Sequence, residues 1–135
     1  MLMQKNKGLF TSIRSDWRTP EDLYKKLDNE FRFDFDPCPT NPTFDGLSIE
    51  WGKRNFVNPP YGREIGKWIA KGFQEWLKGK IVVFLIPSRT DTIWFHDFIM
   101  KATEIRFIEG RLKFSNHHNS APFPSAIAIF TWKEG

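Results

Sequence analysis

Residues 65–86 read IGKWIAKGFQEWLKGKIVVFLI, a pattern that predicts a helix followed by a buried strand. In the first half, large apolar side chains recur at the three- and four-residue spacing of one helical face, namely Ile65, Trp68, Ile69, Phe73, Trp76 and Leu77. Gly79 ends this pattern. The apolar run from Ile81 to Ile86 is continuous and rich in β-branched residues, which is typical of a strand covered on both faces.

Before this unit, the chain predicts one helix and two short strands. Thr19 is expected to cap the helix, with Pro20 at its first position and apolar residues at helical spacing after it. Residues 31–36 alternate apolar and polar side chains, which predicts a short strand. Residues 37–50 are rich in Pro, Asn, Thr and Gly and predict a loop, and residues 55–57 predict a second strand.

After this unit, the chain predicts one more helix and two more strands. Either Thr90 or Asp91 can cap the helix, and residues 104–108 and 126–130 are the strand candidates around a polar loop over 109–124. Helices alternate with strands along the chain. We therefore expect an α/β fold with a mostly parallel sheet that ends in a C-terminal antiparallel hairpin.

The length of 135 residues is that of a single domain. Residues 1–16 lack any period and are expected to form a mobile N-terminal arm, which leaves residues 17–135 as one domain. Cys38 is the only cysteine, so an internal disulfide is excluded and a reducing compartment is expected. The longest apolar run has six residues against the roughly 20 of a membrane span, so we expect a cytoplasmic protein with no membrane partner.

Charge is distributed unevenly along the chain, whose formal net charge is +4. Residues 21–50 hold eight acidic and three basic residues, whereas residues 51–80 hold two acidic and seven basic ones. This asymmetry permits a polyanion partner on one surface, and a solvated lysine-rich helix explains it equally well. His117 and His118 lack a third ligand at suitable spacing, so no metal site is expected.

The chemistry of the chain is concentrated in residues 58–61, Asn-Pro-Pro-Tyr, which follow a predicted strand. Open α/β sheets bind their ligands at the carboxyl ends of their strands. Two consecutive prolines make a rigid turn whose carbonyls are free to accept hydrogen bonds, with an amide before it and an aromatic ring after it. A planar ligand that bears an NH2 group fits this arrangement. The alternative is a loop whose Tyr61 merely packs on the surface.

The tetrapeptide resembles the catalytic motif of amino-methyltransferases that use S-adenosylmethionine. More closely, the chain resembles the small phage-type DNA N6-adenine methyltransferases, the Dam-like family, over about residues 17–130. Besides the tetrapeptide, the resemblance rests on WRTP at 17–20, DPC at 36–38, DGL at 45–47, Trp51, Gly62, Trp68, PSRTDT at 87–92, WFH at 94–96 and GRLKF at 110–114. It implies a reduced Rossmann-like class I methyltransferase sheet. It also implies a protein that is encoded by a phage or prophage and acts in the cytoplasm of a bacterial host.

The resemblance implies direct methyl transfer to N6 of a flipped adenine in double-stranded DNA. The Asn58 side-chain oxygen and the Pro59 carbonyl would accept the two amine hydrogens, which localises the nitrogen lone pair for attack on the sulfonium methyl. Pro60 makes the turn rigid, and Tyr61 would stack on the base. No general base is needed beside this motif before attack.

The resemblance also implies which residues hold the cofactor and the DNA. For the cofactor these are Trp17, Thr19, Pro20, Asp36, Pro37 and Asp45. For DNA phosphates the candidates are Lys53, Arg54, Arg63, Arg89, Arg111 and Lys113. The chain has no Gly-x-Gly loop after its first predicted strand, where most class I methyltransferases carry one. Both a monomer and a homodimer are compatible with the sequence.

Two other functions compete with adenine methylation. The same tetrapeptide occurs in enzymes that methylate RNA or a protein glutamine. The missing glycine loop leaves open a non-catalytic DNA-binding module with a decayed cofactor site. Residues 89–92 and 110–114 favour the DNA enzyme over the RNA or glutamine enzyme.

Overall fold

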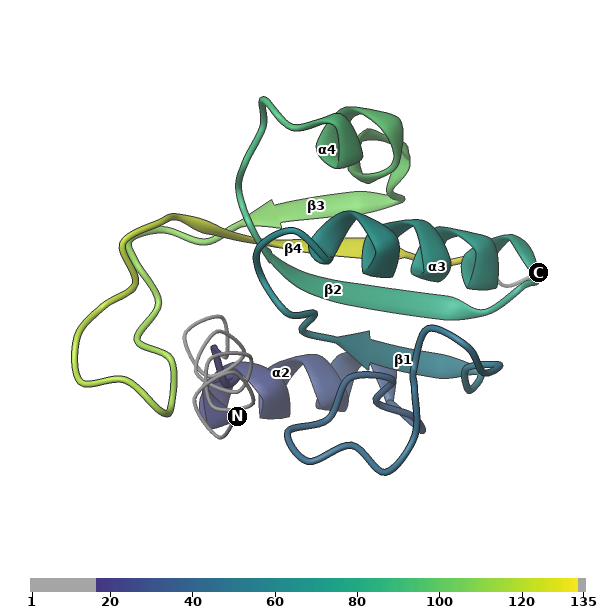
Figure 1. Ribbon diagram of the computed structural model, residues 1–135, viewed down its shortest axis with the longest axis horizontal. Coiled ribbons are helices and arrows are strands. Elements are labelled where there is room, and N and C mark those ends of the chain that lie inside the picture. Colours follow the sequence, from purple (N-terminus) through teal and green to yellow (C-terminus); the bar gives the residue numbers. More distant parts are fainter. Residues whose placement is uncertain (1–16, 134–135) are drawn as a thin grey trace, which may run out of the picture.

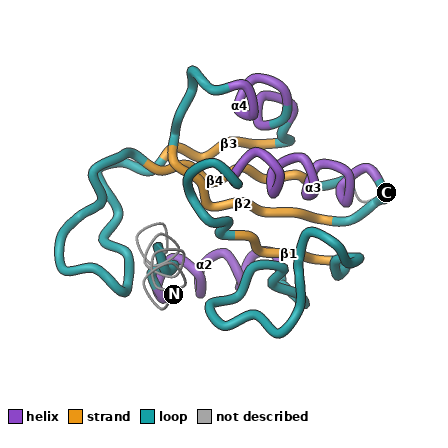
Figure 2. Tube along the Cα trace, in the orientation of Figure 1, coloured by secondary structure: helices purple, strands orange, loops and turns teal. Residues whose placement is uncertain are grey.

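The computed structural model describes residues 17–133, which form one open sheet with helices packed against it (Figures 1 and 2). In chain order the elements are α2 (Glu21–Phe31), β1 (Arg54–Val57), α3 (Ile65–Leu77), β2 (Ile81–Pro87), α4 (Ile93–Asp97), a 3-10 turn (Ile99–Lys101), β3 (Glu104–Phe107) and β4 (Ser125–Phe130). The helix and strand predicted from residues 65–86 are confirmed. The expected arm over residues 1–16 lies outside the described part of the chain.

The sheet has the strand order β1-β2-β4-β3. The prediction of a mostly parallel sheet is wrong, because only the β1–β2 pair among the described strands is parallel. The last strand of the chain, β4, inserts between β2 and β3 and runs antiparallel to both. The C-terminal antiparallel pair is confirmed. Because β4 is antiparallel to both β2 and β3, these two strands run in the same direction, which is also that of β1. The carboxyl ends of β1, β2 and β3 therefore lie at one edge of the sheet.

The predicted strand over residues 31–36 is replaced by a single bridge. Phe31 is the last residue of α2, and Arg32 ends the helix in the left-handed conformation at φ 54°. Only Phe35 pairs with the sheet, in parallel with Asn55 of β1. The apolar residues of the alternating stretch 31–36 pack on the core without forming a strand, since the Phe33 ring contacts both Phe31 and Phe56.

Helices cover both faces of the sheet. On one face, Tyr24 of α2 packs its ring edge-on against Phe56 of β1. On the other face, Gly72 lets α3 approach β2 closely, because a Cβ at this position would lie 2.2 Å from the Phe84 ring. No helix within residues 17–133 combines the length and apolar character needed to cross a membrane.

Both predicted helix caps are displaced. α2 begins after Pro20 and has no side-chain cap, because the Thr19 hydroxyl bonds to Asn58 instead. α4 is capped by Thr92, whose hydroxyl accepts from the Phe95 N–H at 3.3 Å, and not by Thr90 or Asp91. The cap moves because residues 89–92 form a turn closed by the bond from the Thr92 N–H to the Arg89 carbonyl.

Candidate active site

Three chain segments converge at the edge where β1, β2 and β3 end (Figure 1). The tetrapeptide 58–61 directly follows β1. The loop 109–124 follows β3, and its end is fixed to the end of β2 by a bond from the Ser88 N–H to the Pro124 carbonyl at 2.9 Å. The third segment, residues 17–20, leads into α2. The expected site at the carboxyl ends of the strands is therefore the place where the N-terminal segment meets the loop.

The side-chain amide of Asn58 is bonded on one side only. Its Nδ2 donates to the main-chain carbonyl of Trp17 and, at 3.0 Å, to the Thr19 hydroxyl. Its Oδ1 is buried, and no donor within residues 17–133 reaches it. A buried amide oxygen normally has a partner, so this oxygen is suited to accept a hydrogen bond from a ligand.

The orientation of this amide follows from its partners. A main-chain carbonyl can only accept a hydrogen bond, so the group that faces Trp17 has to be the NH2 of Asn58. Rotating the amide by 180° would place its oxygen against the Trp17 carbonyl oxygen and would bring two acceptors together. The segment before α2 therefore decides which end of the Asn58 amide remains for a ligand.

Tyr61 is buried, with 9% of its surface exposed. Its hydroxyl donates to the Leu85 carbonyl at 3.1 Å, and burial raises the pKa of this phenol well above its ordinary value. Its ring packs edge-to-face with Phe114 and Phe123 of the loop 109–124. A base can stack on the whole face of Tyr61 only after this loop moves.

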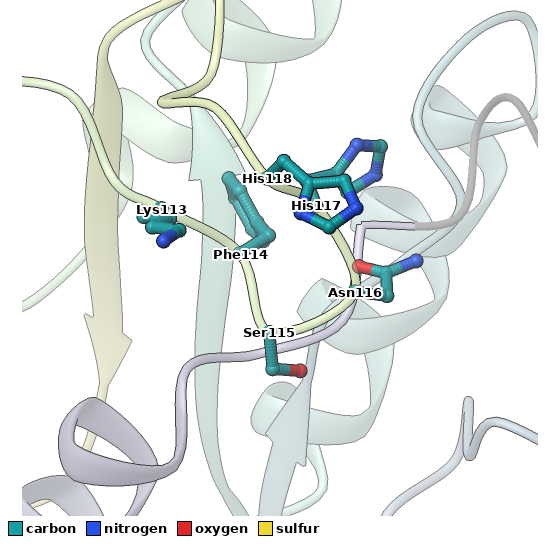
Figure 3. A pocket seen from close by; sticks show the side chains of 6 residues that line it. All are labelled: Lys113, Phe114, Ser115, Asn116, His117 and His118. Carbon is teal, nitrogen blue, oxygen red and sulfur yellow. The ribbon is translucent and has the colours of Figure 1, made fainter.

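The loop 109–124 is held against the segment 17–20 by hydrogen bonds and by ring stacking. The His117 ring stacks on Trp17 with centroids 4.0 Å apart and planes inclined by 13°. The Arg18 N–H donates to Asn116 Oδ1 at 3.0 Å, and the Ser115 N–H donates to the Arg18 carbonyl at 3.0 Å. Figure 3 shows the pale purple ribbon of this segment passing beside Ser115 and Asn116. The chain thus brings together residues nearly 100 positions apart.

A polar pocket of about 440 Å³ opens on this loop (Figure 3). It is lined by Lys113, Phe114, Ser115, Asn116, His117 and His118. Lys113 is exposed, whereas the Phe114 ring is buried and reaches toward Trp17 and Tyr61. The pocket therefore combines a cationic rim with a side chain that contacts the candidate site.

Asp36 lies beside β1, one residue after the bridge between Phe35 and Asn55. Because this bridge is parallel, the main chain runs from Phe35 to Asp36 in the direction of β1, which is toward the edge that holds Asn58. Burial raises the pKa of the Asp36 carboxyl, and a hydrogen bond from the Cys38 N–H to Oδ1 at 2.9 Å opposes this effect. Pro37, which follows it, is buried.

Asp45 has a local structural role. Its Oδ1 accepts from the Leu47 N–H at 3.0 Å, which closes a turn, and the residue is exposed. The turn is held against Pro37 by the next residue, since a Cβ on Gly46 would lie 2.0 Å from the Pro37 carbonyl oxygen. The contacts of Asp45 are therefore those expected of a turn residue.

The six cations proposed for DNA fall into two groups. Arg63, Arg89, Arg111 and Lys113 follow β1, β2 and β3, on the site edge, and all are exposed. Lys53 and Arg54 stand at the opposite end of β1, roughly 13 Å of strand away from Asn58. Arg54 is half-buried and donates from Nε to the Phe31 carbonyl. The structure therefore does not bring Lys53 and Arg54 to the site.

Sequence reasoning missed the residues of the loop that hold the N-terminal segment. Ser115, Asn116 and His117 make these contacts, whereas the residue spacing argues only against a metal site at His117 and His118. A loop residue has no periodic pattern, and the bond from Arg18 to Asn116 spans 98 residues. The only signal was the place of the loop after a strand that ends at the site edge.

One of three comparisons with known proteins gave a match, and it is a match to a family. Residues 17–133 contain no group of three His, Cys, Asp or Glu side chains that could hold a metal ion. Neither the curated proteins nor the solved structures gave a match. Residues 7–131 match the model of the family described as DNA N-6-adenine-methyltransferase (Dam). With nearly the whole chain matched and Asn58 oriented as an acceptor at the strand edge, the protein belongs to the DNA N-6-adenine-methyltransferase (Dam) family.

Proposed function

We propose that the protein transfers a methyl group from S-adenosylmethionine to the N6 amine of an adenine flipped out of double-stranded DNA, with residues 17–135 acting as one methyltransferase domain. One observation carries this proposal: Asn58 holds its NH2 on two acceptors and keeps a buried, unpartnered Oδ1. This oxygen is an acceptor whose direction is fixed before any substrate arrives. The family match supports DNA as the substrate over RNA or a protein glutamine.

Asn58 and Pro59 have complementary parts in the reaction. The adenine amine has two hydrogens and a lone pair that is delocalised into the ring. Oδ1 of Asn58 accepts one hydrogen and the Pro59 carbonyl accepts the other, so the nitrogen becomes tetrahedral and its lone pair can form a bond to the methyl carbon. The bond from this carbon to the sulfonium sulfur would break and leave a neutral thioether, and the methylated nitrogen would lose one of its hydrogens to water as a proton. Because both acceptors are held by the protein before binding, little reorganisation is needed in the transition state. The rigid turn at Pro60 keeps the two acceptors together.

Access of the base requires a movement of the loop 109–124. Phe114 and Phe123 contact the ring of Tyr61, and Oδ1 of Asn58 is buried. The Arg18 N–H donates to Asn116 and the Ser115 N–H donates to the Arg18 carbonyl, and all three residues are exposed, so exchanging these two bonds for bonds to water costs little. The flipped adenine then stacks on Tyr61, which replaces one aromatic contact by another.

The residues near Asp36 fit the cofactor. S-adenosylmethionine, when bound, supplies an electrophilic methyl group on a sulfonium. The half-buried Asp36 carboxylate is disfavoured by desolvation, and a cation such as the ammonium of the methionine portion would relieve this cost. The proposed cofactor residues lie in two segments, with Trp17, Thr19 and Pro20 before α2 and Asp36 and Pro37 beside β1. Thr19 and Asp45 are the weaker members of this set, because the Thr19 hydroxyl is already bonded to Asn58 and Asp45 closes its own turn.

The exposed cations of the site edge would bind DNA phosphates. Arg63, Arg89, Arg111 and Lys113 surround the tetrapeptide on loops that follow three different strands. Contacts of this kind hold a duplex in register and are sensitive to salt. Lys53 and Arg54 are proposed as contacts only for a duplex long enough to reach the other end of β1.

The test is to incubate the protein with methyl-labelled S-adenosylmethionine and, separately, with duplex DNA, RNA or protein, and then to identify the labelled product after digestion. We expect label in N6-methyladenine from DNA. Label at cytosine, or in RNA or protein alone, would overturn the proposal. Binding of DNA without any label would instead support a non-catalytic module.

Asn58→Ala tests the residue that carries the proposal. We expect transfer to fall at least about a hundredfold, because the fixed acceptor for the amine is lost, while DNA affinity stays within about twofold. Asn29→Ala, which alters an exposed asparagine of α2, is the matched control and should transfer at the wild-type rate. Equal loss of transfer and DNA binding in Asn58→Ala would contradict the assigned role.

A further inference from the structure

We infer that Thr19 is a positioning residue for Asn58: together with the Trp17 carbonyl, its hydroxyl holds the NH2 of the catalytic amide and so keeps Oδ1 facing the substrate amine. The inference rests on the proposed function, since it assigns Thr19 a part in the same transfer. The contact itself is a hydrogen bond of 3.0 Å from Asn58 Nδ2 to Thr19 Oγ1. It joins side chains 39 positions apart in the chain.

On its C-terminal side Thr19 is held by a part of the protein that does not depend on the loop 109–124, although the carbonyl of the preceding residue, Arg18, accepts from Ser115 of that loop. It stands two residues before α2, and the Pro20 carbonyl accepts the first helical bond, from the Tyr24 N–H at 3.0 Å. α2 in turn buries Leu27 and Phe31 against the sheet. When the loop opens for a base, Thr19 therefore keeps its place with α2.

The second acceptor of the Asn58 NH2, the Trp17 carbonyl, belongs to a residue that the loop 109–124 holds. The Trp17 carbonyl also binds Asn58 Nδ2, but the Trp17 ring stacks on His117 and packs against Phe114 and Phe123 of the loop. Movement of the loop can therefore shift Trp17. The Trp17 carbonyl selects the NH2 of Asn58, because a carbonyl can only accept, and Thr19 holds that NH2 in place when the loop moves.

The consequence for catalysis is specific. Without an acceptor at residue 19, only the Trp17 carbonyl holds the amide, through one of its two N–H bonds. The amide can then tilt about this single bond, and Oδ1 leaves the position from which it accepts from the adenine amine. Loss of Thr19 should lower the rate of the bound complex more than it lowers the binding of either substrate.

The experiment compares Thr19→Val, which keeps the shape and removes the oxygen, with Thr19→Ser, which keeps the oxygen. We expect kcat to fall about tenfold in Thr19→Val, as for loss of one hydrogen bond to an uncharged group. The KM values for S-adenosylmethionine and DNA should stay within about twofold, and Thr19→Ser should stay close to the wild type. Thr103→Val removes a hydroxyl that accepts from the Thr131 N–H at 2.9 Å, far from the site, and should leave kcat unchanged.

A second readout does not need activity. In a protein with 15N in its asparagine side chains, the NH2 signal of Asn58, identified by its absence in Asn58→Ala, should show two hydrogens protected from exchange with solvent. Thr19→Val should lose that protection for one of them, whereas Thr19→Ser should keep it. If the wild type methylates nothing, the proposed function fails while this measurement still decides the role of Thr19.

Three results would overturn the inference. A raised KM or weaker binding of S-adenosylmethionine in Thr19→Val at unchanged kcat would make Thr19 a cofactor contact. Equal impairment of Thr19→Val and Thr19→Ser would assign the effect to packing of the methyl group. Unchanged kcat and unchanged amide protection in Thr19→Val would show that the hydrogen bond has no part in orienting Asn58.

Discussion

The hydroxyl of Tyr61 donates a hydrogen bond to the main-chain carbonyl of Leu85 over 3.1 Å, which fastens the turn 58–61 to the neighbouring strand β2. The carbonyl belongs to a residue of β2 whose side chain is fully buried. The turn that holds Asn58 and Pro59 is thus attached at both ends, to β1 through the chain and to β2 through Tyr61. The rigidity of the candidate site comes from this second attachment as well as from the two prolines.

Tyr61→Phe removes this attachment and keeps the aromatic ring. We expect the free energy of unfolding to fall by about 1 to 2 kcal/mol, because the buried Leu85 carbonyl loses its partner from the turn. The packing on Phe114 and Phe123 should persist, so DNA binding should be nearly unchanged while kcat falls. Denaturant unfolding and steady-state kinetics measure both effects. A Tyr61→Phe protein as stable as the wild type would show that water replaces the phenol.

Asp36→Asn separates cofactor binding from stability. Burial raises the pKa of Asp36, so the folded state disfavours the ionised carboxyl, and stability is lost as pH rises from the ordinary value near 3.8 through the raised one. Asparagine keeps the oxygen that accepts from the Cys38 N–H. We expect the variant to be at least as stable as the wild type at pH 7, with the difference vanishing toward pH 3. Its affinity for S-adenosylmethionine should fall at least about tenfold.

The control for Asp36→Asn is Asp34→Asn, because Asp34 is exposed and its carboxylate also accepts a main-chain N–H, from Arg54 at 3.0 Å. It should leave cofactor affinity unchanged. Calorimetric titration with S-adenosylmethionine measures the affinities. If both variants bind the cofactor like the wild type, Asp36 does not contact its cationic portion.

Glu75 is a buried carboxylate that ties the loop before β1 to α3. Burial alone would raise its pKa, but hydrogen bonds from Lys80, the Trp51 N–H, Lys78 and Lys71 outweigh burial and hold the pKa at about 2. Glu75→Gln leaves these cations without their shared anion. We expect it to lower the free energy of unfolding by about 2 to 4 kcal/mol at pH 7.

The pH dependence of this effect has a definite sign. Because the folded state lowers the pKa of Glu75 from its ordinary value of 4.5, its stabilisation is complete above pH 4.5 and is lost as pH falls toward about 2. The gap between wild type and Glu75→Gln should therefore close over this range. Glu64→Gln is the control, since Glu64 forms an exposed 3.5 Å pair with Lys67 and should change stability by less than about 0.5 kcal/mol. A gap that persists at pH 2 would exclude this account.

Lys113→Ala and Lys53→Ala test which end of the strands meets DNA. Lys113 is on the rim of the loop pocket at the site edge, and Lys53 precedes β1 at the opposite edge. We expect Lys113→Ala to weaken binding uniformly across sequences and to reduce the slope of log K against log salt by about one. Lys53→Ala should leave the slope for a short duplex unchanged. The reverse pattern would place the DNA against the other end of β1.

Local sequence patterns are sufficient to predict the elements that depend on side-chain periodicity. The helical stripe from Ile65 to Leu77 and the apolar run that begins at Ile81 predicted α3 and β2, because side-chain periodicity reports directly which face is buried. The place of Asn58 after a strand also followed from local pattern, as did the resemblance to the family that the comparison confirmed. Candidate catalytic residues could therefore be named before their surroundings were known.

Three features follow from tertiary structure alone: the insertion of β4 between β2 and β3, the partners of Asn58 and the bond from Arg18 to Asn116. β4 pairs with β2 on one side and with β3 on the other, and strand sequences alone do not distinguish this insertion from a parallel arrangement. Thr19 looked like a helix cap because Pro20 and two acids follow it, yet a competing donor 39 residues away takes its hydroxyl. Hydrogen bonds between distant segments depend on where folding brings their atoms, and no local pattern in the chain records that distance.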